Sequence, residues 1–332
     1  MKSVFDACDP RDDVLKGELR DDIFAARLED VIGDRGEEVY RKPEIFFENT
    51  FPTAGLKTLL NEALGRLTGN DKTANAVIRL ETAFGGGKTH NLIGLYHLAK
   101  GRMPGSRVRT FVNPELVPTK PIENVCGIVG GKLDPSNGID HGDCKTHTLW
   151  GELAYQIGGK AGYEVVEASD RERRAPGIQT LQKLVGDRPA LIMIDELARH
   201  LRVCRRGEDS HLAGQTVAFL MALLEFASSR DRVVVTFTLA DSKDAFAEET
   251  DEIRQELERR IQADISEAKK ISARQERVIT PTAETEISSI VTHRLFKRID
   301  RDAASQTAKA YWDFLCKQGL SAETWGVDEK LT

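Results

Sequence analysis

The sequence predicts an α/β protein in which a parallel β-sheet lies between layers of helices. Strand-like and helix-like segments alternate in the middle of the chain, which is typical of parallel sheets. The runs at 190–194 and 233–239 are continuously apolar, as expected for strands buried on both faces. Three glycines also separate a strand-like segment from a helix-like one, an arrangement that suits a ligand-binding sheet edge.

The predicted core covers residues 71–245. Strands are expected at 76–81, 107–113, 190–194 and 233–239. Helices are expected at about 88–100, 148–159 and 214–228. Residues 127–145 are rich in Gly and Asp, which predicts a loop.

Helical regions are predicted on both sides of this core. Within 1–70, Phe24, Leu28, Val31 and Ile32 recur at helical spacing. Thr53 is the expected N-cap of a helix with an apolar stripe. Within 246–332, a charged segment at 246–275 predicts a solvated helix, and a further helix is expected to start with Thr280 as N-cap and Pro281 at its first position.

Composition points to a globular protein of the cytoplasm. The 332 residues are 40% hydrophobic and 30% charged. No stretch approaches the ~20 apolar residues of a membrane span, and the early acidic N-terminus does not match a secretory signal. The five cysteines are far apart in sequence, so we expect a reducing compartment rather than a disulfide framework.

The segment ETAFGGGKT at 81–89 has the pattern of a phosphate-binding loop, or P-loop. Its glycines allow backbone N–H groups to face phosphate oxygens, and the next helix directs its positive end to the same place. Lys88 can reach the β- and γ-phosphates, and the Thr89 hydroxyl can ligate Mg²⁺. The pattern G-x-x-x-x-G-K-[ST] is broken only at Thr82, where the first glycine is expected. The residues expected to contact a nucleotide are Phe84, Gly85, Gly86, Gly87, Lys88, Thr89 and His90.

A second motif, the apolar strand ALIMI followed by Asp195 and Glu196, agrees with a nucleotide site. Parallel strands deliver their carboxyl ends to one edge of a sheet, where ligands bind. Asp195 is predicted to hold the magnesium, and Glu196 to orient or deprotonate the attacking water. The following strand, VVVTFTLAD, has a polar end, where Thr238 is our candidate for a residue that senses the bound phosphates.

A resemblance to a known family rests on four segments: AFGGGKTHNLIGLYHLAK, ALIMIDELAR, HTLWGELAYQIGG and DPRDDVLKGEL. They resemble large predicted bacterial AAA+-like ATPases of unknown function, which are similar to the ATPase components of phage-exclusion and phage growth limitation systems. The resemblance covers nearly the whole chain. It implies an additional-strand P-loop fold with a helical C-terminal lid, and it implies nucleotide-binding roles for Lys88, Thr89, Asp195 and Glu196.

The resemblance also implies features that the residues do not show by themselves. ATP is the implied nucleotide, a DNA methyltransferase and a helicase are the implied partners, and assembly into a homo-oligomer is compatible with it. A lid arginine can lie near the γ-phosphate in such proteins, and Arg294 is our candidate. Relatives of this kind are usually much longer, and the sequence alone leaves open whether this chain is a piece of a longer protein.

Two further groups of residues have less specific interpretations. Cys126, His141, Cys144 and His147 are of the types that bind zinc, but their spacing matches no familiar metal motif, and we expect ordinary loop residues. The arginines between 199 and 206 follow the Asp-Glu strand. They can reach DNA or a neighbouring subunit's phosphate, although a solvated, salt-bridged helix face is the expected role.

The predicted function is hydrolysis of Mg·ATP coupled to a conformational change, in a DNA-related phage-defence complex. Two alternatives remain: a nucleotide-dependent switch or scaffold without turnover, and a P-loop kinase that phosphorylates a small molecule. Glu196 argues against the switch, since binding alone needs no catalytic carboxylate. The net charge of −6 predicts weak or no DNA binding by this chain alone.

Overall fold

A computed structural model of the chain describes residues 4–17, 26–82, 86–206, 211–240, 250–251, 253–256 and 276–319. Contacts divide the chain into two compact units. The larger unit is Ala25–Glu286, and the smaller unit combines Met1–Phe24 with Ile287–Thr332. This division falls at other positions than the boundaries predicted after 70 and 245, since apolar helices before residue 70 pack onto the sheet of the larger unit.

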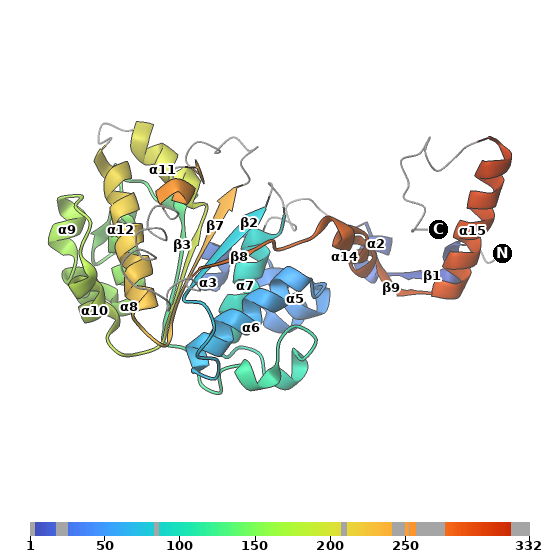
Figure 1. Ribbon diagram of the computed structural model, residues 1–332, viewed down its shortest axis with the longest axis horizontal. Coiled ribbons are helices and arrows are strands. Elements are labelled where there is room, and N and C mark those ends of the chain that lie inside the picture. The colour runs from blue at the N-terminus through green and yellow to red at the C-terminus, as the bar shows by residue number, and fades with distance from the viewer. Residues whose placement is uncertain are drawn as a thin grey trace, which may run out of the picture. The chain divides into compact units, whose positions relative to one another are not determined.

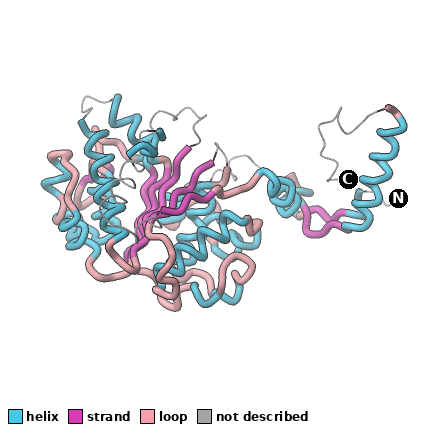
Figure 2. Tube along the Cα trace, viewed as in Figure 1, coloured by secondary structure: helices cyan, strands magenta, loops and turns pink. Residues whose placement is uncertain are grey.

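Five described strands form a parallel sheet at the centre of the larger unit (Figures 1 and 2). They are β2 (Val77–Thr82), β3 (Asn124–Val129), β6 (Ala190–Asp195), β7 (Val233–Ala240) and β8 (Glu276–Ile279). Their order is β3-β6-β7-β2-β8, and every neighbouring pair is parallel. The prediction of an α/β protein with a parallel sheet between helices is therefore confirmed.

The register of the sheet brings the carboxyl ends of β2, β6 and β7 to one edge. Thr82 of β2 pairs with Ala240 of β7, and Ile194 of β6 pairs with Phe237 of β7. Asp195, the last residue of β6, therefore lies beside the end of β7. This edge is where open parallel sheets bind ligands.

Helices cover both faces of this sheet (Figure 1). One face packs against α3 (Leu28–Ile32), α5 (Pro43–Asn49), α6 (Ala54–Thr68) and α7 (Lys88–Ala99). The other packs against α8 (Leu149–Glu164), α10 (Ile178–Val185), α11 (Leu197–Arg206) and α12 (His211–Ser228). Shorter elements connect these helices and strands along the chain. They are α4 (Glu38–Arg41), α9 (Glu167–Arg171), the hairpin of β4 (Ile139–Asp140) and β5 (Lys145–Thr146), and single 3-10 turns at Gly105–Arg107, Pro114–Leu116, Gly130–Lys132 and Glu284–Glu286.

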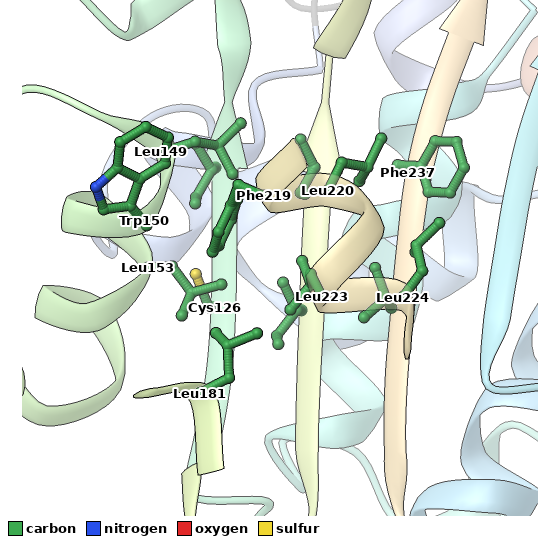
Figure 3. Packing of buried hydrophobic residues seen from close by; sticks show 14 of the residues in the cluster. Cys126, Leu149, Trp150, Leu153, Leu181, Phe219, Leu220, Leu223, Leu224 and Phe237 are labelled. Atoms are coloured by element: carbon green, nitrogen blue, oxygen red, sulfur yellow. The ribbon is translucent and has the colours of Figure 1, made fainter. Parts of the chain in front are cut away.

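Helix α12 lies on the same face of the sheet as α8 and contributes to the same apolar core (Figure 3). Its Phe219 is fully buried and lies against Trp150 of α8, with ring centroids 5.5 Å apart. Within the described part of the chain, α12 alone is long and apolar enough to cross a membrane by length and composition. A buried core helix passes the same test, so this composition is weak evidence for a membrane span.

The strand predicted at 107–113 is wrong. This segment forms a 3-10 turn and further turns, in which the N–H groups of Phe111 and Val112 both donate to the carbonyl of Val108. The apolar residues Val108, Phe111 and Val112 are buried at helix-like spacing, and Pro104 and Pro114 bound the segment. The strand beside β6 is β3 instead, whose last residues fall inside the predicted loop at 127–145.

The helix predicted to start at Thr280 begins later. The chain first forms the edge strand β8, then a loop, and then α14 (Ile287–Leu295). The loop is tied to the start of α6, because Thr53 Oγ1 donates to the Pro281 carbonyl at 2.8 Å. Thr53 also caps α6 as predicted, by accepting the N–H of Leu56 at 3.1 Å. Most of the helix predicted at 246–275, like Phe24, lies outside the described residues.

The smaller unit joins segments from opposite ends of the sequence. It contains α1 (Val4–Ala7), β1 (Cys8–Pro10), α2 (Asp12–Leu15), α14, β9 (Phe296–Ile299) and α15 (Arg301–Lys317). β1 pairs antiparallel with β9, and Lys297 Nζ lies 2.7 Å from Asp12 Oδ1. Asp300 caps α15 by accepting the N–H of Ala303 at 3.0 Å.

Candidate functional site

The glycine-rich segment leads from β2 into α7. Gly87 has φ +81° and is the N-cap of α7, a left-handed position that favours glycine. Lys88, the first helical residue, donates from Nζ to the Thr82 carbonyl at 2.7 Å. The predicted contact residues Phe84 and Gly85 lie outside the described residues. The described part thus places the lysine and the helix N-terminus at the carboxyl end of β2.

Thr82, the residue that departs from the glycine pattern, packs directly against Gly86. A Cβ added to Gly86 would overlap the Thr82 side chain and lie 2.6 Å from its Oγ1. A threonine at 82 is therefore accommodated because residue 86 has no side chain. Gly86 is needed here because its lack of a side chain allows this close packing.

Two threonine hydroxyls from neighbouring parts of the sheet edge donate to one carboxylate, that of Asp195. Asp195 is 3% exposed, and its Oδ2 accepts a hydrogen bond from Thr89 Oγ1 at 2.6 Å. Its Oδ1 accepts a hydrogen bond from Thr238 Oγ1, also at 2.6 Å. Thr89 and Asp195 are the predicted magnesium ligands, and their hydroxyl and carboxylate oxygens are of the hard type that Mg²⁺ prefers. The arrangement can hold a divalent cation beside the helix N-terminus.

Glu196 follows Asp195 in an unusual backbone conformation. Its φ is +54°, and its N–H donates to Thr238 Oγ1 at 2.9 Å and to Asp195 Oδ1 at 3.0 Å. A left-handed backbone conformation is uncommon for a non-glycine residue, and such strain is concentrated at functional sites in proteins. The side chain, 37% exposed, forms an ion pair with Arg199 of α11 at 3.2 Å.

His90 lies one residue beyond Thr89 and contacts the N-terminal helices. Its Nε2 lies 2.9 Å from Thr50 Oγ1, and its ring is 4.5 Å from that of Phe46. Thr50 donates its own proton to the Phe46 carbonyl, so the histidine nitrogen is the donor to Thr50. These contacts fix the ring in place, and a nucleotide contact of His90 stays a prediction.

An arginine that sequence reasoning missed reaches the same sheet edge. Arg254, in a helical segment after β7, forms an ion pair with Glu81, the residue before Thr82. Glu81 also lies 3.3 Å from Arg79, and Arg254 lies 3.0 Å from Asp251. The sequence does not predict this role, because residues 246–275 are rich in charged side chains and no pattern distinguishes Arg254 from its neighbours.

Arg294 belongs to the smaller unit, where its guanidinium lies 4.0 Å from Asp13. Its predicted place near the γ-phosphate therefore stays a prediction. Among the arginines of α11, Arg199 pairs with Glu196, and Arg202 and Arg205 are half-buried. The histidine between them, His200, is fully buried, and burial lowers its pKa to about 4, so it adds no charge beside Glu196 at neutral pH.

Of the four zinc-type residues, the two histidines contact different carboxylates. Cys126 is buried in β3, and burial raises the pKa of its thiol well above the usual value. His141 Nε2 lies 2.9 Å from Glu152, and His147 Nδ1 lies 3.5 Å from Asp170. No cluster of three or more His, Cys, Asp and Glu side chains suited to a metal occurs among the described residues. All five cysteines, which lie within the described ranges, are free thiols.

The comparisons with known proteins place the chain in a family. Among curated proteins, the comparison found no match. The family model DUF499 N-terminal domain matches residues 4–111 and 123–272. The matched ranges contain Lys88, Thr89, Asp195, Glu196 and Thr238, but not Arg294. Because the match covers most of its length, this chain belongs to the DUF499 family and carries its N-terminal domain.

Proposed function

We propose that this chain binds Mg·ATP at the loop of residues 84–89 and hydrolyses it, coupling turnover to a conformational change. The observation that carries the proposal is the pair of 2.6 Å hydrogen bonds joining Thr89, Asp195 and Thr238. These bonds bring together the hydroxyl of Thr89, which follows Lys88 of the glycine-rich loop, and the carboxylate of Asp195 at the end of β6. The two motifs predicted these two groups independently.

The strand order supports the finer fold assignment within this proposal. β7 lies between β2, which leads into the glycine-rich loop, and β6, which ends in Asp195. An extra strand at this position is what the additional-strand class of P-loop ATPases is named for. In the same arrangement, the polar end of β7 stands between loop and carboxylate, where Thr238 can respond to both.

Each residue has a chemical role in the proposed reaction. Thr89 and Asp195 would hold magnesium, and the bound ion would spread the charge that develops on the phosphoryl oxygens. The Lys88 ammonium, released from the Thr82 carbonyl, would bind the β- and γ-phosphates. Glu196 would orient the attacking water or accept its proton. The first experiment is to measure ATP turnover by the purified chain, alone and with added DNA.

A second measurement separates the ATPase from the two alternative functions. A nucleotide-dependent switch would bind ATP without releasing phosphate, whereas a small-molecule kinase would transfer the phosphoryl group to an acceptor. Phosphate release measured with and without a panel of small acceptors distinguishes the three. The choice of ATP over other nucleotides rests on the resemblance, as do a methyltransferase and a helicase as partners, a role in phage defence and homo-oligomer formation. The proposed cytoplasmic location rests on the composition and on the wide spacing of the cysteines.

Thr238→Val is expected to destabilise the protein and weaken nucleotide turnover. Valine keeps the shape but removes the hydroxyl, so Asp195 Oδ1 loses a donor and the Glu196 N–H loses an acceptor. An unsatisfied buried polar group costs about 1–3 kcal/mol. Denaturant unfolding and phosphate release would be measured together, with Thr238→Ser as the matched control that keeps the hydroxyl. Equal stability of the valine and serine variants would contradict this role.

Duplex DNA is expected to bind this chain weakly or not at all at physiological salt. The net charge is −6, so long-range attraction to phosphates is unfavourable. Fluorescence anisotropy at about 150 mM salt would measure the affinity for duplex DNA. At this salt concentration, non-specific dissociation constants are typically about 10⁻⁴–10⁻⁶ M. Submicromolar binding by the chain alone would show that a local basic surface outweighs the net charge.

A further inference from the structure

The two neighbouring carboxylates at the end of β6 have their contacts on opposite sides of that strand. Asp195 contacts Thr238 of β7 and Thr89 beyond β2, so it faces the glycine-rich loop. The Glu196 side chain instead contacts Arg199 and the segment that follows β3, the strand on the other side of β6. In this conformation the Glu196 carboxylate lies on the β3 side of β6, whereas the proposed magnesium ligand Asp195 has its contacts on the β7 side.

Gly131 makes this position of Glu196 possible. A Cβ added to Gly131 would overlap Glu196 Oε2 and would lie 2.9 Å from Arg199 Nη1. Gly131 belongs to the 3-10 turn Gly130–Lys132, which continues directly from β3. We call the contact among Glu196, Arg199 and Gly131 the Glu196 resting contact.

The backbone of Glu196 is held independently of this contact. Its N–H is bonded to Thr238 and Asp195, and its carbonyl accepts the N–H of His200 at 3.2 Å. Rotation about the side-chain bonds can therefore carry the carboxylate away from Arg199 while these backbone bonds persist.

Arg199 is the cation that the described contacts bring to Glu196. His200 is neutral at neutral pH because burial lowers its pKa to about 4. Lys132, in the same turn as Gly131, lies 3.7 Å from Glu29. The Arg199–Glu196 pair is half-exposed, at 53% and 37%, so its strength is modest and it can break in each turnover.

We propose that Arg199 is a positioning residue that holds Glu196 in a resting position, and that Glu196 leaves the resting contact for hydrolysis to occur. This inference rests on the proposed ATPase function and adds a regulatory step to the same site. Any interaction that draws Arg199 away, with nucleotide bound at the loop, releases the carboxylate and raises the rate. Arg199 then sets the basal rate without touching the nucleotide.

Two variants release Glu196 by different physical means. Arg199→Ala removes the ion-pair partner, whereas Gly131→Ala keeps Arg199 but fills the space that Glu196 Oε2 occupies. Both are expected to raise kcat about 1.5- to 5-fold with little change in KM, the factor that corresponds to the ~0.2–1 kcal/mol of an exposed ion pair. Because both abolish one contact, the double variant should not exceed the larger single effect.

Controls separate this positioning role from a structural one. Arg199→Lys keeps a positive charge and should stay close to the wild-type rate. In a Glu196→Gln background, Arg199→Ala should have no effect, since the carboxylate that it holds is gone. Thermal melting identifies any variant that fails to fold; if Gly131→Ala does so, the comparison of alanine with lysine at 199 carries the test.

The outcomes distinguish this inference from the proposed function. A rise in kcat for Arg199→Ala, restored by lysine and absent without Glu196, supports the inference. A fall in kcat would overturn it, because Arg199 would then assist the reaction directly, and an unchanged kcat would overturn it while leaving the ATPase function intact. Failure of the wild-type chain to bind ATP, measured by calorimetry, would overturn both.

Discussion

Lys88→Ala is expected to abolish nucleotide binding while leaving the fold intact. The lysine is the first residue of α7, and its ammonium donates to the Thr82 carbonyl at 2.7 Å. Its removal leaves the strand, the loop and the helix in place, but it removes the cation that phosphates require at the helix N-terminus. Calorimetric titration with Mg·ATP and thermal melting would be measured on the same preparation.

The matched control for this variant is Lys57→Ala. Lys57 lies exposed on α6 and carries the same charge. Its loss should leave both affinity and melting temperature unchanged. Wild-type affinity in the Lys88 variant would refute the phosphate-binding role of the loop, whereas a collapse of the melting temperature would assign the lysine a structural role instead.

Glu196→Gln should bind Mg·ATP normally but turn it over about 100- to 10,000-fold more slowly, the contribution typical of a general base or water-orienting group. The amide keeps the size of the side chain and loses its charge. The backbone bonds of Glu196 to Thr238 and Asp195 do not involve the side chain, so the sheet edge should remain intact. Single-turnover phosphate release, with binding measured separately, tests the expectation.

Glu115→Gln provides the comparison for an exposed glutamate outside the site. It should match the wild-type protein in both measurements. A normal rate in Glu196→Gln would show that water is activated elsewhere. A loss of binding would indicate that Glu196 contributes to metal binding or folding rather than to the chemical step.

The contact among Thr89, Asp195 and Thr238 could be expected from the sequence because it depends only on strand ends. Each residue stands at the end of an apolar run or directly after the glycine-rich loop, and parallel strands bring such positions to one edge. The α/β class follows from the same runs. Continuous apolar strands have few alternative environments besides a sheet covered on both faces.

Contacts that depend on β3 could not be derived in this way. The segment at 107–113 has as many β-branched residues as a strand, but its buried side chains recur at helix-like spacing rather than at every second position. Choosing it as the second strand hid the true partner of β6, and with it the position of Gly131 beside Glu196. A Gly-Gly pair in a polar stretch indicates a loop, and only the pairing of β3 with β6 shows what the second glycine contacts.

The pairing of β1 with β9 has a consequence for the order in which the chain folds. Cys8 lies opposite Ile299, so β1 can pair only after β9 and all the residues between the two strands have been synthesised. A contact of such long sequence separation forms late, because loop closure precedes any stabilisation from it. Since domains generally fold as units during synthesis, we expect the sheet of the larger unit to assemble before β1 pairs with β9, and removing β9 removes the strand with which β1 pairs.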